Sequence, residues 1–208
     1  MTAITSNDQT SKRSARRKVA AVLAGGLVLG VGTMATLASW NDSEFASATF
    51  TAGKFNLEGA VDASQATFSE HATSGAAGGL TFTAPVGNLT PNDVVAAPYA
   101  VRLAANTTNN ATLNLVAAAN TTGTVTNLTY ELIKTIGAGC TTASTGTVIV
   151  AAGTAVTSVS PTPITLNMGS PTTLAGAPAY LCFKVTAGAG LVQGQTGIGS
   201  WVFTATSS

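Results

Sequence analysis

The stretch that decides the fold is residues 33–57, TMATLASWNDSEFASATFTAGKFNL. Its first six residues end an uncharged apolar run, and the rest begins a segment in which apolar and polar residues alternate. We therefore expect two parts. A signal peptide over 1–38 would be removed by cleavage between Ala38 and Ser39, and a secreted domain would occupy 39–208.

The alternation in this stretch predicts a β-strand. Alanine or phenylalanine occupies the even positions from 46 to 52, and serine or threonine the odd ones. After Gly53 the phase changes, so that Phe55 and Leu57 become the apolar positions. Because strand side chains alternate with a period of two, such a change needs an extra residue or a bend, and glycine suits a bulge. The pattern predicts one bent N-terminal strand over 46–58.

Upstream of this stretch the sequence has the order of a secretory signal. The basic cluster SKRSARRK (11–18) precedes VAAVLAGGLVLGVGTMATLA (19–38), which has no charge and ends with small residues at Thr36 and Ala38. That order is typical of a cleaved signal peptide, with a helix across the apolar region. The alternative is a permanent membrane anchor, since about 20 apolar residues can span a bilayer. The Arg16-Arg17 pair leaves the twin-arginine export route open.

Downstream, short alternating segments recur with turn residues between them, and none has a helical period. The secreted part is therefore predicted to be all-β, an antiparallel β-sandwich with a jelly-roll-like arrangement. The expected strands after the first are 80–86, 97–104, 111–117, 124–136, 147–151, 163–168, 179–186 and 197–206. Residues 60–79, rich in Ala, Ser and Gly, are expected to form a loop.

The charge of the secreted part argues against nucleic acid as a partner. Only 8% of all residues are charged, and past Ala38 four cations and seven anions give a net charge of −3. A mildly acidic surface rich in hydroxyl and amide groups does not attract phosphate backbones.

Two cysteines, Cys140 and Cys182, are the only ones in the chain. In an exported protein one disulfide between them is expected. The alternative is a pair of unpaired buried thiols.

Candidate catalytic groups are few, so we expect no enzyme, no bound metal and no cofactor. His71 is the single histidine and lies in the expected loop beside Glu70, whereas zinc hydrolases commonly use two histidines and a glutamate. A serine–histidine arrangement would have to use His71, but no serine occupies a G-x-S-x-G turn. AGAGLVQG (187–194) lacks the lysine of a phosphate-binding loop and reads as a hairpin turn.

Aromatic residues offer two interpretations. Stacking on sugars would need them on one exposed face, whereas their alternation with Val, Leu and Phe favours core packing. The residues in question are Trp40, Tyr99, Tyr130, Tyr180 and Trp201.

The junction over 32–57 resembles that of the TasA/camelysin family of Gram-positive surface and biofilm-matrix proteins. The family's aromatic–Asn/Asp–Asp start is matched by Trp40-Asn41-Asp42, and its Thr-Phe-x-Ala-Gly-x-Leu-Asp-Leu-like strand by 49–57, where Phe55 and Asn56 depart from the pattern. LTPND (89–93) is similar to the family's Leu-x-Pro-Gly-Asp turn, with Asn92 in place of glycine. GQTGIGSWVFTAT (194–206) resembles a closing strand of actinobacterial members. The resemblance implies export through a dedicated signal peptidase.

Together these features predict a structural subunit of a cell-surface or extracellular-matrix fibre that acts outside the cell. Cleavage would free 39–57, which would add as a strand to the open sheet edge of another copy. Trp40, Phe50, Phe55 and Leu57 would belong to this assembly strand, and head-to-tail addition would build filaments that contact the cell wall or matrix. One alternative is that 46–58 pairs within its own domain. The alternatives for function are a monomeric adhesin or glycan-binding module and a camelysin-like peptidase.

Overall fold

The computed structural model describes residues 14–23, 43–84 and 86–208, without the side chains of Asn120 and Thr121. The chain divides into two units, Met1–Phe50 and Thr51–Ser208. In the first unit residues 14–23 are helical, whereas most of the apolar run, the predicted cleavage site at Ala38–Ser39 and Trp40 lie outside the described residues. None of the helices that the structure describes has both the length and the hydropathy needed to cross a bilayer.

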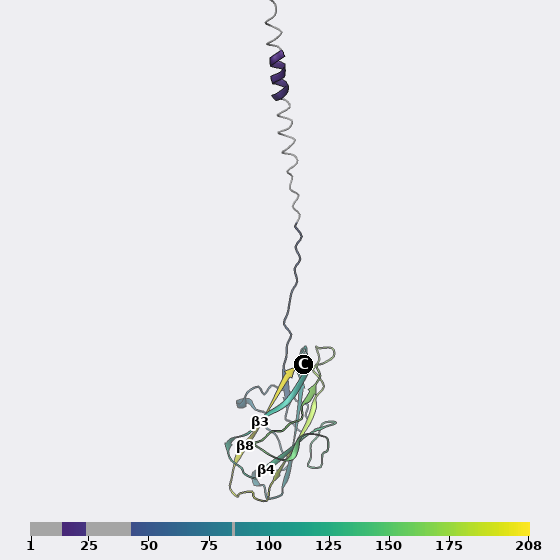
Figure 1. Cartoon of the computed structure of the whole chain (residues 1–208). Helices are drawn as coiled ribbons and strands as arrows, with labels where there is room; N and C mark the ends of the chain where they lie inside the picture. The colour runs from purple at the N-terminus through teal and green to yellow at the C-terminus, as the bar shows by residue number, and fades with distance from the viewer. Residues whose placement is uncertain (1–13, 24–42, 85) are drawn as a thin grey trace, which may run out of the picture. The chain divides into compact units, whose positions relative to one another are not determined.

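The second unit is an antiparallel β-sandwich, which confirms the predicted all-β class (Figure 1). Its described part holds a five-stranded sheet in the order β1-β2-β7-β4-β5 and a three-stranded sheet in the order β6-β3-β8. The finer expectation of a jelly roll is not established by these strand orders. The strands are β1 (Leu57–Ala60), β2 (Val94–Leu103), β3 (Ala111–Gly123), β4 (Leu128–Thr135), β5 (Thr147–Ala155), β6 (Ile164–Leu166), β7 (Ala179–Ala187) and β8 (Gly197–Ser207). Short 3₁₀ helices lie at η1 (Ser74–Ala76) and η2 (Val86–Asn88).

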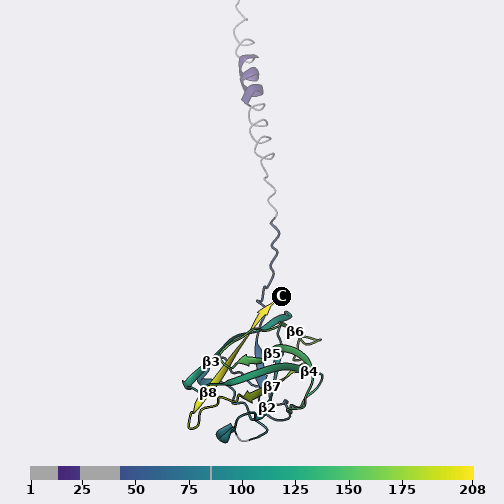
Figure 2. The same cartoon turned by 60° about the horizontal axis from the view of Figure 1, so that its bottom comes forward.

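The core lies between the two sheets, and the period-two pattern explains its composition. On β7 the residues Leu181, Phe183 and Val185 are buried in it, while the intervening Tyr180, Cys182 and Lys184 face away from it. Leu113 and Leu115 of β3 close the core from the other sheet. The two pairings at the centre of the large sheet join segments that are distant in sequence, because β7 pairs with both β2 and β4 (Figure 2).

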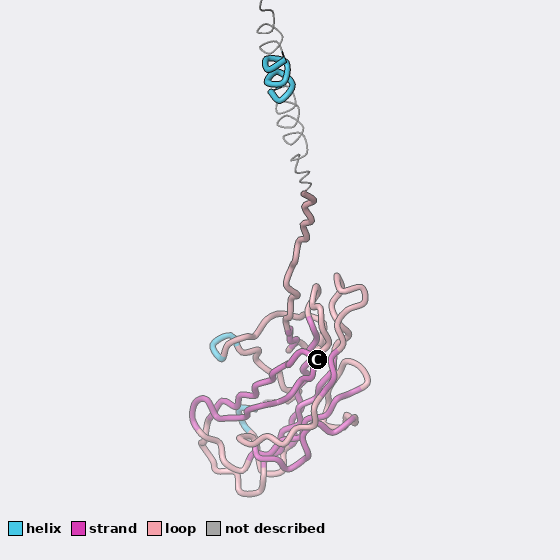
Figure 3. The backbone as a smooth tube through the Cα atoms, turned by 45° about the horizontal axis from the view of Figure 1, so that its top comes forward, coloured by secondary structure: helices cyan, strands magenta, loops and turns pink. Residues whose placement is uncertain are grey.

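Loops cover part of the outer face of the five-stranded sheet, and Figure 3 traces these connections in pink. The loop after β1 places Gln65 there, 1% exposed and in a left-handed backbone conformation (φ 52°). Its Nε2 donates to the carbonyl oxygens of Tyr99 (2.5 Å) and Leu181 (3.2 Å), and its Oε1 accepts from the Gly139 N–H (2.7 Å). One buried amide thus joins β2, β7 and the loop after β4, which satisfies polar groups that burial would otherwise leave unpaired.

The expected strand over 46–58 is wrong in extent. Residues 43–53 have no regular secondary structure, Lys54 forms an isolated parallel bridge with Thr107, and regular pairing begins at Leu57 opposite Leu103. The change of phase at Gly53 therefore marks the point where the chain meets the sandwich, not a bend inside a strand. A side chain at 53 would collide with Thr108, which explains the glycine.

The expected strand over 80–86 is also wrong. The described part of this segment, 80–84, contains no strand, and η2 begins at Val86. Thr83 alone is hydrogen-bonded to β2: its N–H donates to the Ala96 carbonyl oxygen at 2.7 Å. Leu80 and Phe82 instead pack against the core as covering side chains. Alternation over so few residues shows only that one face of the segment is apolar. A loop that packs against the core can have such a face as well as a strand.

The turn at 89–93 shows why asparagine can stand in a glycine position. Asn92 has φ 74°, a conformation that Gly and Asn adopt most readily. The Asp93 carboxylate accepts the Thr90 N–H at 2.7 Å, and the Asn92 N–H donates to the Ala187 carbonyl oxygen at 2.7 Å. This turn therefore fixes the start of β2 against the end of β7.

We expect Asp62→Asn to loosen the loop after β1 at neutral pH. The Asp62 carboxylate accepts hydrogen bonds from the Ser64 hydroxyl and from the N–H groups of Thr67 (3.0 Å) and Ala66 (3.2 Å). The Ser64 contact, followed by the backbone contacts, lowers the pKa of Asp62 from 3.8 to about 2. Because the folded pKa is depressed, the stabilisation is complete above pH 3.8 and is lost as the pH falls towards 2.

Amide hydrogen exchange at Ala66 and Thr67 measures this effect. Both amides should exchange faster in the Asp62→Asn variant than in the native protein at pH 7, and the two proteins should converge near pH 2. Equal protection at pH 7 would contradict the role of the carboxylate.

Candidate functional site

An aromatic cluster occupies the centre of the sandwich. Phe183 of β7 lies 4.9 Å from Trp201 and 6.3 Å from Phe203, both on β8, measured between ring centroids. Tyr99 and Tyr130 lie at 6.3 Å and 6.4 Å from the same ring. These side chains connect the two sheets, so three of the five aromatic residues considered for sugar binding, Tyr99, Tyr130 and Trp201, pack in or against the core instead.

Burial keeps the hydroxyl groups of Tyr99 and Tyr130 neutral. It raises the pKa of Tyr99 to about 12 and also raises the pKa of Tyr130, an effect that the neighbouring Trp201 partly opposes. The Tyr130 hydroxyl donates to the Ser158 carbonyl oxygen at 2.9 Å. The buried Nε1 of Trp201 lies near this hydroxyl but makes no hydrogen bond of acceptable geometry. Both tyrosines therefore stay neutral and structural at physiological pH.

The aromatic side chains of β8 are less covered than their neighbours. Leu113 and Leu115 on β3 are 1% and 2% exposed, whereas Trp201 and Phe203 face the same core but are only half-buried. The difference follows from position in the sheet, because β3 is flanked by β6 and β8 while β8 has a strand neighbour only at β3 within the described residues. Figure 2 shows β8 beside β3.

The other sheet edges are covered or short. β1 is bridged by Ser69 at Gly59, and the Thr162 N–H donates to the Ile149 carbonyl oxygen of β5 at 2.8 Å. β6 has three residues. By contrast β8 has eleven residues without a charge or a proline, the features by which natural edge strands resist pairing with other chains. The edge of β8 is therefore the most accessible template for an added strand in the described part of the sandwich.

The pairing register shows which backbone groups face this edge. The Ser208 N–H donates to the Asn110 carbonyl oxygen, and Ser207 is opposite Ala111. Because inward and outward groups alternate along an antiparallel strand, the N–H and C=O groups of Phe203 and Ala205 point away from β3. An added strand would bond to these groups and would lie beside the half-buried rings.

Residues 43–53 have the composition of such an added strand and lie outside the regular structure of the fold. The exposed fractions of Phe45 and Phe50 are 93% and 91%. Phe55 is 41% exposed, and Leu57 lies in β1, half-buried against the core of its own domain. Leu57 therefore does not belong to a freely exposed assembly strand as expected, because its backbone already pairs with β2.

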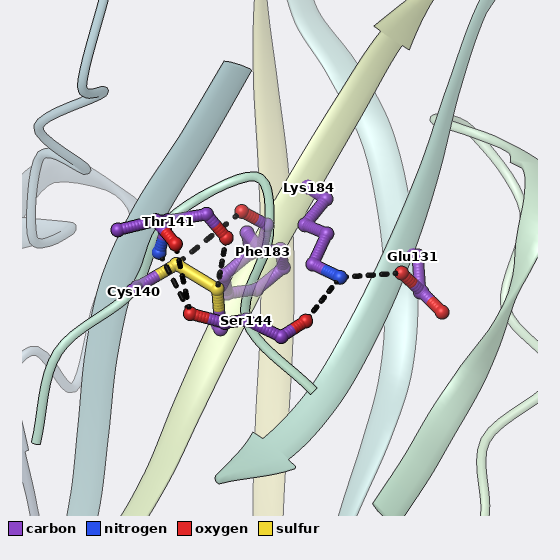
Figure 4. Close-up of polar contacts among 7 residues, drawn as sticks. Glu131, Cys140, Thr141, Ser144, Phe183 and Lys184 are labelled. Atoms are coloured by element: carbon purple, nitrogen blue, oxygen red, sulfur yellow. Dashed lines mark hydrogen bonds and ion pairs between the residues drawn. A yellow bond between two sulfur atoms is a disulfide. The ribbon is translucent and has the colours of Figure 1, made fainter. Parts of the chain in front are cut away.

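The disulfide between Cys140 and Cys182 is present, as predicted, with the two Cα atoms 5.1 Å apart. It lies in a small buried cluster with Ala96 and Ile133 on the outer side of the five-stranded sheet. Beside it the Lys184 Nζ contacts the Glu131 carboxylate at 3.2 Å and donates to the Ser144 carbonyl oxygen at 2.6 Å (Figure 4). The disulfide and the hydrogen bond from Lys184 to Ser144 together fix the 136–146 loop on β7, while the ion pair joins β7 to Glu131 of β4. Such a bond is compatible with an oxidising, extracytoplasmic compartment.

Among the described residues, no three His, Cys, Asp or Glu side chains gather as metal ligands. The Glu70 carboxylate accepts from the Asn56 amide, while the His71 ring contacts Ser69 and the Ala76 carbonyl oxygen. The structure thus places His71 in a hydrogen-bonded loop, as the sequence suggests, and adds a serine partner that the sequence analysis did not identify. The spacing of two residues in an extended segment is a signal that could have found Ser69, because such residues share a face.

Tyr180, one of the aromatic candidates for sugar stacking, lies at a surface depression. The depression is lined by Lys134, Thr135, Ile136, Gly146, Thr147, Pro178 and Tyr180. A single ring does not form the aromatic row that a glycan-binding face would need. Sequence reasoning also missed the edge position of β8, since an edge position depends on strand order.

The fold and the site together define a disulfide-bonded all-β sandwich in which, among the described strands, β8 pairs with β3 alone. No protein-family model matches the chain, and no curated protein matches it significantly.

Proposed function

We propose that the chain is a secreted, non-catalytic structural subunit that assembles by adding its N-terminal segment to the β8 edge of another copy. The observation that carries this proposal is the eleven-residue, uncharged edge of β8 beside half-buried Trp201 and Phe203. An added strand would pair its backbone with Phe203 and Ala205 and cover the aromatic rings, so that hydrogen bonds and apolar burial both favour assembly.

The donor in this proposal is 43–53 of a second copy. Its even-numbered apolar residues share one face in an extended conformation, and Phe50 would lie against the rings beside β8. The segment contains one charge, Glu44, so little repulsion opposes its approach to an uncharged edge. Donor and acceptor are different surfaces, so each copy can receive one strand and give another. Such a heterologous contact builds an open filament when its rotation does not close a ring.

Export is part of the same proposal. The signal-like order of residues 1–38 and the Cys140–Cys182 disulfide support a location outside the cytoplasm. Cleavage at Ala38–Ser39 by a signal peptidase would leave the donor near the new N-terminus. Contacts with the cell wall or matrix would then be made by the filament surface.

Deleting residues 43–52 from the exported protein should abolish filaments seen by electron microscopy. The deletion removes the donor and stops before β1, so the sandwich should keep its disulfide and its far-ultraviolet circular dichroism. A synthetic peptide of 43–53 added to the intact protein should shorten filaments by capping the β8 edge. Filaments that persist unchanged after the deletion would refute strand addition.

A matched pair of lysine substitutions tests the acceptor. Val202 on the edge strand β8 and Val116 on the central strand β3 have almost equal exposed fractions, 48% and 50%. Val202→Lys should block assembly because a charge on an edge strand opposes pairing with another chain, whereas Val116→Lys should not. Equal effects of the two substitutions would place the contact elsewhere. A monodisperse protein that binds to a glycan array would instead favour the adhesin alternative.

A further inference from the structure

Ser69 and His71 form a hydrogen-bonded pair on the loop that follows β1. The Ser69 Oγ lies 3.2 Å from the His71 Nε2, and the His71 Nδ1 lies 3.1 Å from the carbonyl oxygen of Ala76. Ser69 is exposed and His71 is half-buried. A nucleophile, a base within hydrogen-bond reach and a third group that orients the base are the parts that activate a serine.

The contact with Ala76 determines the direction of the other hydrogen bond. A carbonyl oxygen can only accept, so Nδ1 carries the hydrogen in this contact. In the neutral imidazole the proton-free nitrogen is then Nε2, which accepts from the Ser69 hydroxyl. The ring is thus held in the tautomer that can remove the serine proton.

The backbone around the pair is fixed rather than free. Ser69 is bridged to Gly59 by two hydrogen bonds, each with a nitrogen–oxygen distance of 2.9 Å. A Cβ added to Gly78 would lie 3.1 Å from the His71 Nε2, the nitrogen that contacts Ser69, and 2.7 Å from the Val61 Cγ1. Glycine at this position therefore leaves the space beside Nε2 that any side chain would fill.

The charged side chains near Ser69 and His71 make their contacts with other groups. The Glu70 carboxylate accepts a hydrogen bond from the Asn56 amide. The Asp62 carboxylate accepts hydrogen bonds from the Ser64 hydroxyl and the Thr67 N–H. Arg102 makes an ion pair with Glu58 at 3.0 Å and lies over the Phe68 ring. The His71 ring is consequently oriented by a backbone carbonyl and not by a carboxylate.

We propose that Ser69 is a nucleophile that accepts an acyl group from reactive carboxylic esters, with His71 as its general base. The Ser69 Oγ attacks the ester carbonyl carbon while its proton passes to the His71 Nε2. The carbon–oxygen bond to the leaving alcohol then breaks, and that alcohol takes the proton from Nε2. The product is one O-acyl-Ser69 per chain, which is a covalent modification site independent of strand addition at β8.

A fluorophosphonate is the probe for this reactivity, because it reports activated serines. The Ser69 Oγ forms a bond to phosphorus, the phosphorus–fluorine bond breaks, and the proton leaves with fluoride. The purified, oxidised protein should gain one label, located at Ser69 by peptide mass spectrometry. Ser69→Ala should abolish labelling, whereas Ser74→Ala, at an exposed serine of the same loop, should not change it.

Two variants test the base while keeping the serine. His71→Gln keeps a polar side chain but removes the base, and labelling should slow by about 100-fold, the usual contribution of a general base. Gly78→Ala keeps both groups and crowds Nε2, so it should also slow labelling. Unchanged thermal unfolding of the variants would separate these effects from misfolding. No label, a label spread over several serines, or an equal rate in His71→Gln would overturn the proposal.

Discussion

Phe183→Ala should reduce the free energy of unfolding by about 3–5 kcal/mol, the usual cost of removing a buried phenylalanine ring. Phe183 is 1% exposed and lies on β7, in the middle of the five-stranded sheet. Its ring meets four other aromatic rings from β2, β4 and β8, with centroid distances from 4.9 to 6.4 Å. Substitution would leave a cavity at the point where the two sheets meet.

Urea unfolding followed by tryptophan fluorescence measures this loss, because Trp201 is the nearest ring to Phe183. Phe50→Ala is the matched control. Phe50 is 91% exposed, and its truncation should change the free energy of unfolding by less than about 0.5 kcal/mol. A loss below about 1 kcal/mol for Phe183→Ala would mean that the sandwich does not depend on this cluster.

Replacing both cysteines by alanine should cost about 4 kcal/mol, since the Cys140–Cys182 bond closes a loop of 42 residues. In the chain-entropy model the bond stabilises the fold by restricting the unfolded chain. For a domain of this size the change corresponds to a decrease in Tm of roughly 10 °C. The 136–146 loop should be affected first, because the disulfide and the Lys184–Ser144 hydrogen bond fix it on β7.

Calorimetry of the oxidised protein, the reduced protein and the double alanine variant tests this expectation. Reduction should lower the Tm in the same direction as the substitution. Thiol labelling of the oxidised protein should detect no free cysteine. Two reactive thiols before reduction, or a Tm unchanged by the double substitution, would contradict the structural role of the bond.

Much of the fold could be predicted from the sequence because apolar and polar residues alternate with a period of two through much of 39–208. The segments 111–117 and 179–186 lie within β3 and β7. The pattern failed at 46–53 and 80–84, where alternation gives one apolar face but no neighbouring strand offers a full set of backbone partners. Alternation shows which face of a segment is apolar, whereas strand pairing depends on whether another strand lies next to that segment.

The candidate site was less predictable, because it depends on strand order. Nothing local to 197–207 indicates that β8 is an edge strand, as its sequence resembles that of a central one. Its edge position results from the order β6-β3-β8, which joins segments separated by long stretches of chain. The Ser69–His71 pair likewise depends on the Ala76 carbonyl and on Gly78, and these return to the ring through the loop.

By itself the sequence determined the all-β class, the net charge of −3 over 39–208 and the cysteine pair, because composition, charge and short-range alternation act locally along the chain. Only the tertiary structure decided where the chain joins the sandwich and which strand is left with an open edge. It also showed that Tyr130 is a core residue and that Tyr99 and Trp201 are partly buried against the core. These outcomes depend on contacts between segments that are distant in sequence. Each contact stabilises the fold only when both segments have reached their positions.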